Sequence, residues 1–358
     1  ILLVLEAARR AVGLPITIIA GVFLLYGLYG NYFPGFLAHR GQSIESLTQL
    51  MFYTTDGILG TPLSVSATYI FLFLLFAAFL VKTGVGQYFN DLAVAVAGKL
   101  VGGPAKVAIF SSALQGTISG SSVANVVTSG SYTIPMMKKL GYKKEFAGAV
   151  EASASTGGQL MPPIMGAAAF LMVEFIGRGI SYWDIAKAAA IPALLYFTGI
   201  WIMTHFEAKR LGLKGLTEEE MPNRIEVFKK IYLLTPILLI IVLLMNGMHV
   251  AHAALYGILA CIVVGFINPD VKLGIKELIE ALADGARSAL AVAAATACAG
   301  IIVGVVVKTG LGLSLATSLV KLAGGSILLT LIFVMFASLI LGMGAPTTAN
   351  YVITSTIA

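Results

Sequence analysis

Long apolar segments alternate with short polar ones along most of this 358-residue chain. A helix that crosses a bilayer needs about 20 predominantly apolar residues. Several segments approach or reach that length, and we interpret them as membrane spans: residues 12–30, 66–81, 184–204, 231–245, 253–267 and 287–307. Amphipathic stretches between them predict helices that lie along the membrane surface: residues 44–57, 87–100 and 268–284.

Two polar stretches rich in small residues interrupt this apolar background. Residues 115–131 read QGTISGSSVANVVTSGS, and residues 342–350 read GMGAPTTAN. Each follows an apolar piece that is too short to cross a bilayer, at residues 103–114 and 327–341. Unsatisfied backbone groups are costly in lipid, so such stretches must line a site or be buried in protein. We therefore expect the two stretches to form two halves of one binding site.

Basic residues indicate how these segments meet the membrane. The lysines at 138, 139, 143 and 144 follow the first polar stretch, and the positive-inside rule places them in the cytoplasm. The pattern thus predicts a re-entrant hairpin near residues 103–137 and another near 325–358, entering from opposite faces. Residues 145–177 contain TGGQLMPP, which cannot sustain a regular helix. We expect this crossing to be broken near its middle.

Composition agrees with an integral membrane protein. The chain is 58% hydrophobic and 11% charged, with a mean hydropathy of +0.93, whereas a globular domain has about a quarter charged residues. The net charge of +6 comes from basic residues between apolar segments, as cytoplasmic loops require, and does not indicate nucleic acid. Cys261 and Cys298 lack metal-ligand spacing. Because G-x-S-x-G and H-E-x-x-H motifs are absent, we do not expect an enzyme.

An internal repeat organises the sequence. VKTGVG at residues 81–86 recurs as VKTGLG at 307–312, and LVGG at 100–103 recurs as LAGG at 322–325. Asn125 and Asn350 then align after a short gap. Chance similarity among membrane segments is the alternative, but the shared order of these short words favours a true repeat. Hairpins entering from opposite faces are typical of inverted-repeat secondary transporters with a midplane site.

On this basis we divide the chain into four segments. Residues 1–65 hold an N-terminal span and an outer segment, and residues 66–205 hold the first repeat. Residues 206–285 hold a cytoplasmic loop, two connecting spans and a surface helix, and residues 286–358 hold a truncated second repeat. Both ends of the chain lie within apolar sequence, so we expect it to be part of a longer protein.

Several motifs resemble one family of membrane proteins. SALQGTISGSSVANV, IPMMKKLGY and TGGQLMPP, in that order, are similar to the large membrane subunit of TRAP transporters, the tripartite ATP-independent periplasmic transporters. GMGAPTTANY is similar to that family's second hairpin motif, and EFAGAVEASASTGGQ resembles the TAXI branch, whose small and large membrane subunits are fused. The resemblance covers nearly the whole chain. Relative to that family, the chain lacks most of the small-subunit portion, and its second half lacks a counterpart of residues 141–170.

This resemblance implies an all-α integral membrane fold of the ion-transporter superfamily. The expected architecture is an elevator-type inverted-repeat transporter with two re-entrant helical hairpins and surface-lying amphipathic arm helices. The implied activity is symport of organic acids, with sodium as the coupling ion and no other cofactor. Family substrates include C4-dicarboxylates and sialic acid and, for the TAXI branch, glutamate or 2-oxoglutarate.

The resemblance also implies partners and a location. The expected partners are a periplasmic substrate-binding protein, a small membrane-subunit region and the lipid bilayer. The expected location is the bacterial or archaeal cytoplasmic (inner) membrane, with multiple spans. A passive channel or facilitator for small anions remains the alternative, because Gly/Ser-rich re-entrant loops also build selectivity filters.

The candidate site residues are the hydroxyl, amide and glycine positions of the polar segments. Unwound backbone and polar side chains at the midplane supply oxygens for sodium, and a helix start presents N–H groups that suit a carboxylate. We predict sodium ligands at Ser119, Gly120, Ser122, Asn125, Thr156, Gly157, Gly342, Gly344 and Thr347. We predict substrate-binding residues at Ser121, Ser122, Asn125, Thr347, Thr348 and Asn350.

Plainer explanations exist for each of these features. Small residues also permit close helix packing, and the segment from Thr156 to Gln159 also fits a structural kink before Pro162 and Pro163. Glu151 is the acidic residue that we place within a crossing. Carboxylates inside a membrane are often functional, but this one lies close enough to the lysines to pair with them at the interface.

Overall fold

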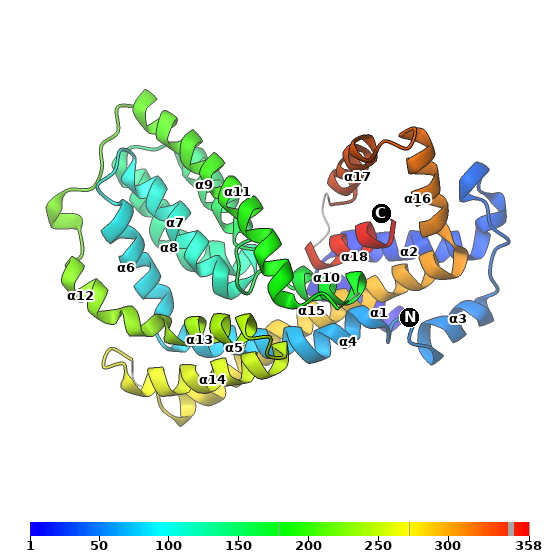
Figure 1. Cartoon of the computed structure of the whole chain (residues 1–358), viewed down its shortest axis with the longest axis horizontal. Coiled ribbons are helices and arrows are strands. Elements are labelled where there is room, and N and C mark those ends of the chain that lie inside the picture. The colour runs from blue at the N-terminus through cyan, green and yellow to red at the C-terminus, as the bar shows by residue number, and fades with distance from the viewer. Residues whose placement is uncertain (178, 272, 343–346, 358) are drawn as a thin grey trace. The chain divides into compact units, whose positions relative to one another are not determined.

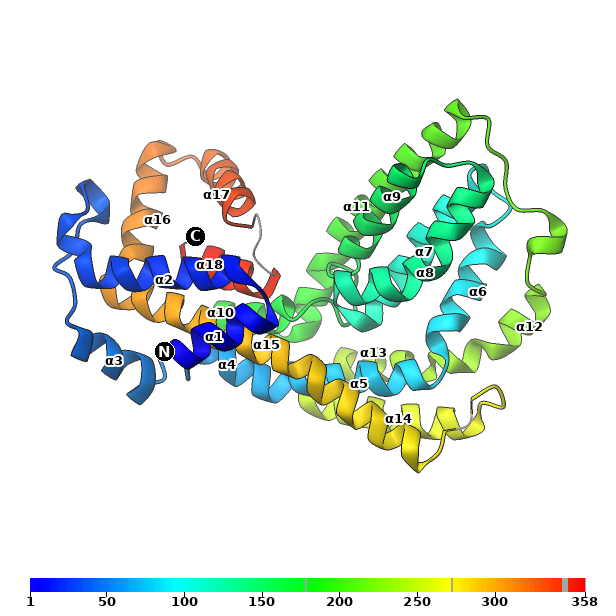
Figure 2. The same ribbon diagram turned by 180° about the vertical axis from the view of Figure 1, so that it is seen from behind.

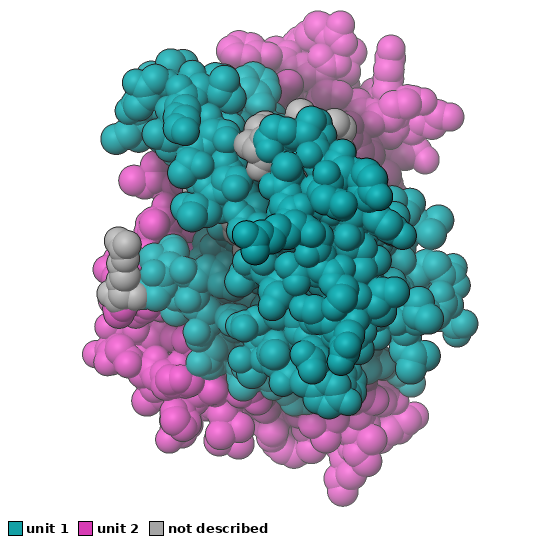
Figure 3. All heavy atoms as spheres, turned by 90° about the vertical axis from the view of Figure 1, so that its right-hand side faces the viewer, with its two compact units in different colours: residues 1–71, 170–177, 287–358 teal, residues 72–169, 178–286 magenta. Residues whose placement is uncertain are grey.

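The computed structural model describes residues 1–177, 179–271, 273–342 and 347–357. These residues form α-helices joined by turns, short 3₁₀ segments and a π-helical segment at Ser66–Ile70, with no β-strand among them. The chain divides into two compact units, which Figure 3 colours separately. Unit 1 comprises residues 1–71, 170–177 and 287–358, and unit 2 comprises residues 72–169 and 178–286.

Unit 1 joins the start of the chain to its last part. Its helices are α1 (Leu2–Ala11), α2 (Leu14–Tyr29), α3 (Ile44–Tyr53), α4 (Thr61–Val65), most of α10 (Ala168–Ile176), the second half of α15 (Ile275–Thr309), α16 (Leu311–Leu322), α17 (Ile327–Gly342) and α18 (Thr347–Ile357). Its apolar core unites α1, α2, α3 and α15 (Figures 1 and 2) and includes the fully buried Ile16, Met51 and Ile301.

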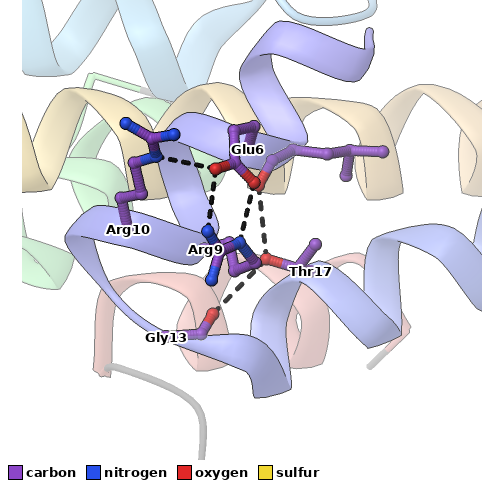
Figure 4. Close-up of polar contacts among 6 residues, drawn as sticks. Glu6, Arg9, Arg10, Gly13 and Thr17 are labelled. Atoms are coloured by element: carbon purple, nitrogen blue, oxygen red, sulfur yellow. Dashed lines mark hydrogen bonds and ion pairs between the residues drawn. The ribbon is translucent and has the colours of Figure 1, made fainter.

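An ion-pair cluster on α1 precedes the first long apolar helix. The carboxylate of Glu6 accepts hydrogen bonds from Arg9 Nε at 2.7 Å and Arg10 Nε at 2.6 Å (Figure 4). Thr17, one turn into α2, donates to the carbonyl of Gly13 at 3.4 Å. The hydrogen bonds from Arg9 and Arg10 lower the pKa of Glu6 from 4.5 to about 2.

The low pKa of Glu6 predicts a pH dependence for α1. Because the pKa is depressed in the folded chain, the ion pair contributes its stability above pH 4.5 and loses it as the pH falls through about 2. The contribution is small because the group is exposed. Thermal unfolding of the wild type and Glu6→Gln should therefore differ slightly above pH 4.5 and converge near pH 2. A difference that grows as the pH falls would contradict this assignment.

Unit 2 contains the first polar stretch. Its helices are α5 (Phe71–Lys82), α6 (Val85–Ala97), α7 (Gly103–Ser119), α8 (Ser122–Leu140), α9 (Lys144–Gly157), α11 (Tyr182–Arg210), α12 (Arg224–Lys229), α13 (Thr235–Met245), α14 (Val250–Ile267) and the first part of α15. Helices α7, α8 and α9 pack against one another, and α11 covers α7 and α9 (Figures 1 and 2). Alanines dominate this contact, with Ala105, Ala147 and Ala154 fully buried, and such small side chains let helix backbones approach closely.

Among the described residues, six helical segments are long and apolar enough to cross a membrane, which agrees with a multi-pass membrane protein. They are residues 14–32, 61–82, 182–210, 218–245, 250–267 and 275–309. Their exposed faces carry large apolar side chains such as Ile191 and Leu195 on α11, as expected of surfaces that face lipid tails.

One expected boundary was wrong. Sequence patterning placed a surface helix at 268–284 and a separate span at 287–307, but the structure joins them in the continuous helix α15 of 35 residues. Gly285 lies inside this helix, and a Cβ there would lie 3.0 Å from Cα of Leu75 on α5. This glycine therefore serves a close helix–helix approach and does not end the helix.

A similar series of helices follows each copy of the repeated sequence words, and the internal repeat itself stays a prediction. Helix α5, a left-handed Gly84 (φ +83°), α6, α7 and α8 follow one another in the first copy. Helix α15, a left-handed Gly310 (φ +70°), α16, α17 and α18 follow in the second. Both glycines sit where a side chain would strain the backbone. Opposite orientation of the two copies in the membrane stays a prediction.

Candidate functional site

A tight turn between α7 and α8 carries the first polar stretch. Gly120 ends α7 in the left-handed conformation (φ +53°), and Ser121 is the N-cap of α8, where its hydroxyl accepts from the N–H of Ala124 at 3.3 Å. A Cβ on Gly120 would lie 2.0 Å from the carbonyl oxygen of Met165, so only glycine fits. The predicted hairpin at 103–137 is thus a helix–turn–helix, and its entry into the membrane from one face stays a prediction.

The serines around this turn are half-buried and interact locally. Ser119 Oγ accepts from the N–H of Ser121 at 3.4 Å. Ser122 Oγ accepts from Gln159 Nε2 at 3.1 Å, which ties the start of α8 to the loop after α9. The predicted residues Ser119, Gly120, Ser121 and Ser122 therefore lie together at one turn.

The end of α9 meets α7 at a backbone-to-backbone contact. A Cβ on Gly116 would lie 2.1 Å from Cα of Gly158, so the two glycines touch directly. The break predicted near this point is present, since α9 ends at Gly157 and α10 begins only at Ala168. Two helix C-termini, those of α7 and α9, are thus close to each other, and their partial negative charge favours a cation.

Thr156 and Gly157 lie beside this contact rather than in it. Thr156 is exposed, and its hydroxyl donates to the carbonyl of Ala152 within α9 at 2.8 Å. A Cβ on Gly157 would meet the ring of Tyr196 on α11 at 2.5 Å, so this glycine faces α11. Gly158, one residue later, is the position that faces the α7–α8 hairpin.

Asn125, in the first turns of α8, is a buried polar side chain. It is 1% exposed, and its Nδ2 donates to the carbonyl of Ser112 on α7 at 2.9 Å. A Cβ on Gly158 would lie 2.9 Å from the same Nδ2, which places the amide beside the Gly116–Gly158 contact. Its Oδ1 has no hydrogen-bond partner among the described residues. Such an oxygen is costly unless a ligand satisfies it.

The second polar stretch lies in unit 1 and repeats part of this arrangement. A Cβ on Gly342 would lie 2.8 Å from Nδ2 of Asn350, and Asn350 Oδ1 is also buried without a partner among the described residues. Thr348 is buried, whereas Thr347 is exposed at the start of α18. Gly344 lies outside the described residues. That the two stretches form one site stays a prediction, since each belongs to a different unit.

Glu151 joins α7, α8 and α9 through hydroxyl groups. It is fully buried and accepts hydrogen bonds from four hydroxyls: Ser112 at 3.2 Å, Ser155 at 3.0 Å, Ser129 and Thr133. No lysine lies within ion-pair distance of it in the part of the chain that the structure describes. The alternative that Glu151 pairs with lysines at the interface is therefore wrong.

A second buried polar cluster was not predicted from the sequence. Asn90 of α6 accepts hydrogen bonds from Ser111 and from Gln115 Nε2 of α7, the latter at 3.0 Å. Helical spacing was the available signal, because Ser111 and Gln115 lie four residues apart on one face of α7. The same spacing aligns Asn125, Ser129 and Thr133 on the buried face of α8.

The arrangement in unit 2 fits a monovalent cation. Sodium sites at unwound midplane helices use neutral oxygens and helix C-termini. Asn125 Oδ1 supplies a buried oxygen that lacks a donor, the α7 and α9 C-termini are adjacent, and Ser122 adds a hydroxyl oxygen at the same turn. The N-terminus of α8, where Ser121 caps the N–H of Ala124, carries the partial positive charge that suits a carboxylate. The described residues contain no His, Cys, Asp and Glu group that would hold a transition metal.

Comparisons with known proteins find similarity to transporter permeases. The chain is 27% identical over 252 residues to a C4-dicarboxylate TRAP transporter large permease protein of Vibrio cholerae, covering 70% of the chain and 50% of that protein. It is 27% identical over 161 residues to the sialic acid TRAP transporter large permease protein of the same organism, covering 44% of the chain and 37% of that protein. It is also 27% identical over 206 residues to an isethionate TRAP transporter permease of Oleidesulfovibrio alaskensis, covering 57% and 29%.

These relatives are transporter permeases and not enzymes. The chain spans about half the length, or less, of the curated relatives it matches. The sequence profile of the family described as "Tripartite ATP-independent periplasmic transporter, DctM component" matches residues 1–358. The chain therefore belongs to the DctM family, the large permease component of tripartite ATP-independent periplasmic transporters.

Proposed function

We propose that this chain forms part of a secondary active transporter that imports organic acids by sodium symport. The observation that carries the proposal is the buried, donor-less Oδ1 of Asn125 beside the Gly116–Gly158 contact. A single cation there would satisfy this oxygen and the C-termini of α7 and α9 together. Ser119, Gly120 and Ser122 complete the first ion site in this proposal, and Gly342 and Thr347 contribute to its repeat-related counterpart.

The substrate class is an organic anion. The named substrates of the relatives, C4-dicarboxylate, sialic acid and isethionate, all carry an acidic group. A carboxylate suits the N-terminus of α8, where Ser121 and Ser122 expose hydroxyls and the first N–H groups lack helical partners. Thr347, Thr348 and Asn350 would bind its other end. A dicarboxylate, glutamate or 2-oxoglutarate is the expected cargo.

The complete transporter would need further components. A periplasmic binding protein would deliver the substrate, and a small membrane-subunit region, fused as in the TAXI branch, would complete the permease. Its place would be the inner membrane of a bacterium or archaeon. The polar turns would reach the midplane as re-entrant hairpins, and unit 2 would move in an elevator-type cycle.

The test is uptake of labelled organic acids by the full-length permease, reconstituted in liposomes with its binding protein. We expect saturable uptake that requires an inward sodium gradient and stops when potassium replaces sodium. Equal uptake with and without the gradient would remove sodium coupling. Ohmic conductance of small anions without saturation would instead show a channel.

A further inference from the structure

Glu151 holds a carboxyl group in the most protected part of unit 2. It is the one acidic side chain that is buried among the residues described here, at 0% exposed. Hydroxyls from α7, α8 and its own helix α9 all donate to its two oxygens. An ionised carboxylate accepts hydrogen bonds and donates none, so this ring of donors suits the charged form.

Among the residues that the structure describes, no basic side chain acts as a counter-ion for this carboxylate. The basic residue of α7, Lys106, points its ammonium at Nδ1 of His205, 3.0 Å away. Lys138 and Lys139 are exposed at the far end of α8, and Lys144 begins α9 about two turns from Glu151. No described basic side chain lies within ion-pair distance of Glu151. A buried charge is costly unless an opposite charge or a metal ion compensates it.

Glu151 is connected to the candidate ion site by two short hydrogen-bonded links. Ser129 Oγ lies within hydrogen-bond distance of the Glu151 carboxylate and, at 2.8 Å, of the carbonyl oxygen of Asn125, and its single hydrogen can go to one of the two at a time. Ser112 donates to Glu151, while its carbonyl accepts from Asn125 Nδ2. Ser129 lies one helical turn from Asn125, a rise of about 6 Å. The ligands available beside Asn125 are neutral, so they offer a cation oxygens but no opposite charge.

We propose that the Glu151 carboxylate is the counter-charge of the sodium ion held beside Asn125, acting through space and without contacting the ion. This inference rests on the proposed sodium site. Each charge then removes the electrostatic cost of burying the other. Opposite charges about 6 Å apart in an effective dielectric of about 20 attract strongly enough to change a binding constant roughly a hundredfold. Glu151 is thus a positioning and charge-balancing residue and not a ligand.

The test compares Glu151→Gln with Glu145→Gln in the purified full-length permease. Glu145 is an exposed glutamate at the start of the same helix, so its variant is a matched control. The readout is the rise of the thermal unfolding midpoint with sodium, at constant ionic strength with potassium, which reports sodium affinity without transport. We expect the half-saturating sodium concentration to increase at least tenfold in Glu151→Gln and to stay at the wild-type value in Glu145→Gln.

The outcomes separate this inference from the proposed function. A wild type whose midpoint does not respond to sodium would contradict the sodium site itself. A responsive wild type with an unchanged half-saturation in Glu151→Gln would overturn the role of Glu151. Should Glu151→Gln not fold, Glu151→Asp is the second variant, because it keeps the negative charge on a shorter side chain. A half-saturating sodium concentration near the wild-type value in Glu151→Asp supports the proposal, and an increase of tenfold or more overturns it.

Discussion

Replacing Gly116 with alanine should both destabilise the permease and abolish its uptake. A Cβ at this position would lie 2.1 Å from Cα and 3.0 Å from the carbonyl oxygen of Gly158, and both are backbone atoms that cannot rotate away. Helices α7 and α9 must therefore separate. Overpacking of this kind costs about 3 kcal/mol of unfolding free energy. The separation would also pull the C-termini of the two helices away from Asn125.

The matched control for this substitution is Gly148→Ala in α9. A Cβ there meets nothing within 4 Å, and the position is helical. Alanine should stabilise this helix by about 0.5–1 kcal/mol and leave uptake unchanged. The two variants are compared first by their unfolding in detergent and then by their uptake in proteoliposomes. If the two variants have the same unfolding free energy and the same uptake rate, the contact between Gly116 and Gly158 has no importance for the site.

Replacing Asn125 with alanine should remove sodium-dependent uptake while the protein stays folded. The substitution deletes the buried Oδ1 that lacks a donor, together with the hydrogen bond from Nδ2 to Ser112. Loss of that neutral hydrogen bond costs only about 1 kcal/mol of stability. Loss of an oxygen that binds a charged ligand costs about 1.5–3 kcal/mol, so sodium affinity should fall by roughly ten- to a hundredfold.

Asn246→Ala is the control for this variant. The Nδ2 of Asn246 also donates to a backbone carbonyl, that of Val242 at 2.8 Å, but the residue is exposed at the end of α13. Uptake at increasing sodium concentration should therefore be normal for Asn246→Ala and require far more sodium for Asn125→Ala. A wild-type sodium response in Asn125→Ala would show that its buried oxygen does not bind the ion. Such a result would also show that close packing alone explains the polar turn.

The sequence predicted the positions of those helices whose ends are set by the length of an apolar segment or by a glycine. The hairpin turn was predicted because Gly120 and the serines interrupt an apolar run, and the left-handed φ of Gly120 provides the reason. The join between 268–284 and 287–307 was missed because the first stretch is amphipathic and the second is apolar, so the pattern alone divides them. Gly285 packs closely on Leu75, a contact that no local pattern encodes.

The residue types of the candidate site were predicted from the sequence, but the contacts between them were not. Asn125 and the serines of the turn were identified from their residue types, whereas the role of Gly158 depends on a close approach to Gly116 that is 42 residues away in the chain. The hydrogen-bond partners of Glu151 could not be predicted from the sequence either. Its hydroxyl partners come from three helices, and the sequence offered lysines two turns away as equally good partners.

The α7–α8 turn must face the transport pathway within the membrane if it holds the ion and the substrate. A single cysteine at Val123 tests it, because this side chain is 73% exposed in the first turn of α8 and the native Cys261 and Cys298 are buried and can be replaced by alanine. A membrane-impermeant thiol reagent is applied from each side of the membrane, with Glu145→Cys, which the positive-inside rule predicts to be cytoplasmic, as the control. We predict labelling at position 123 from either side, and a change in its rate when sodium and substrate are added. Labelling from one side only, at a rate that neither sodium nor substrate alters, would contradict the account.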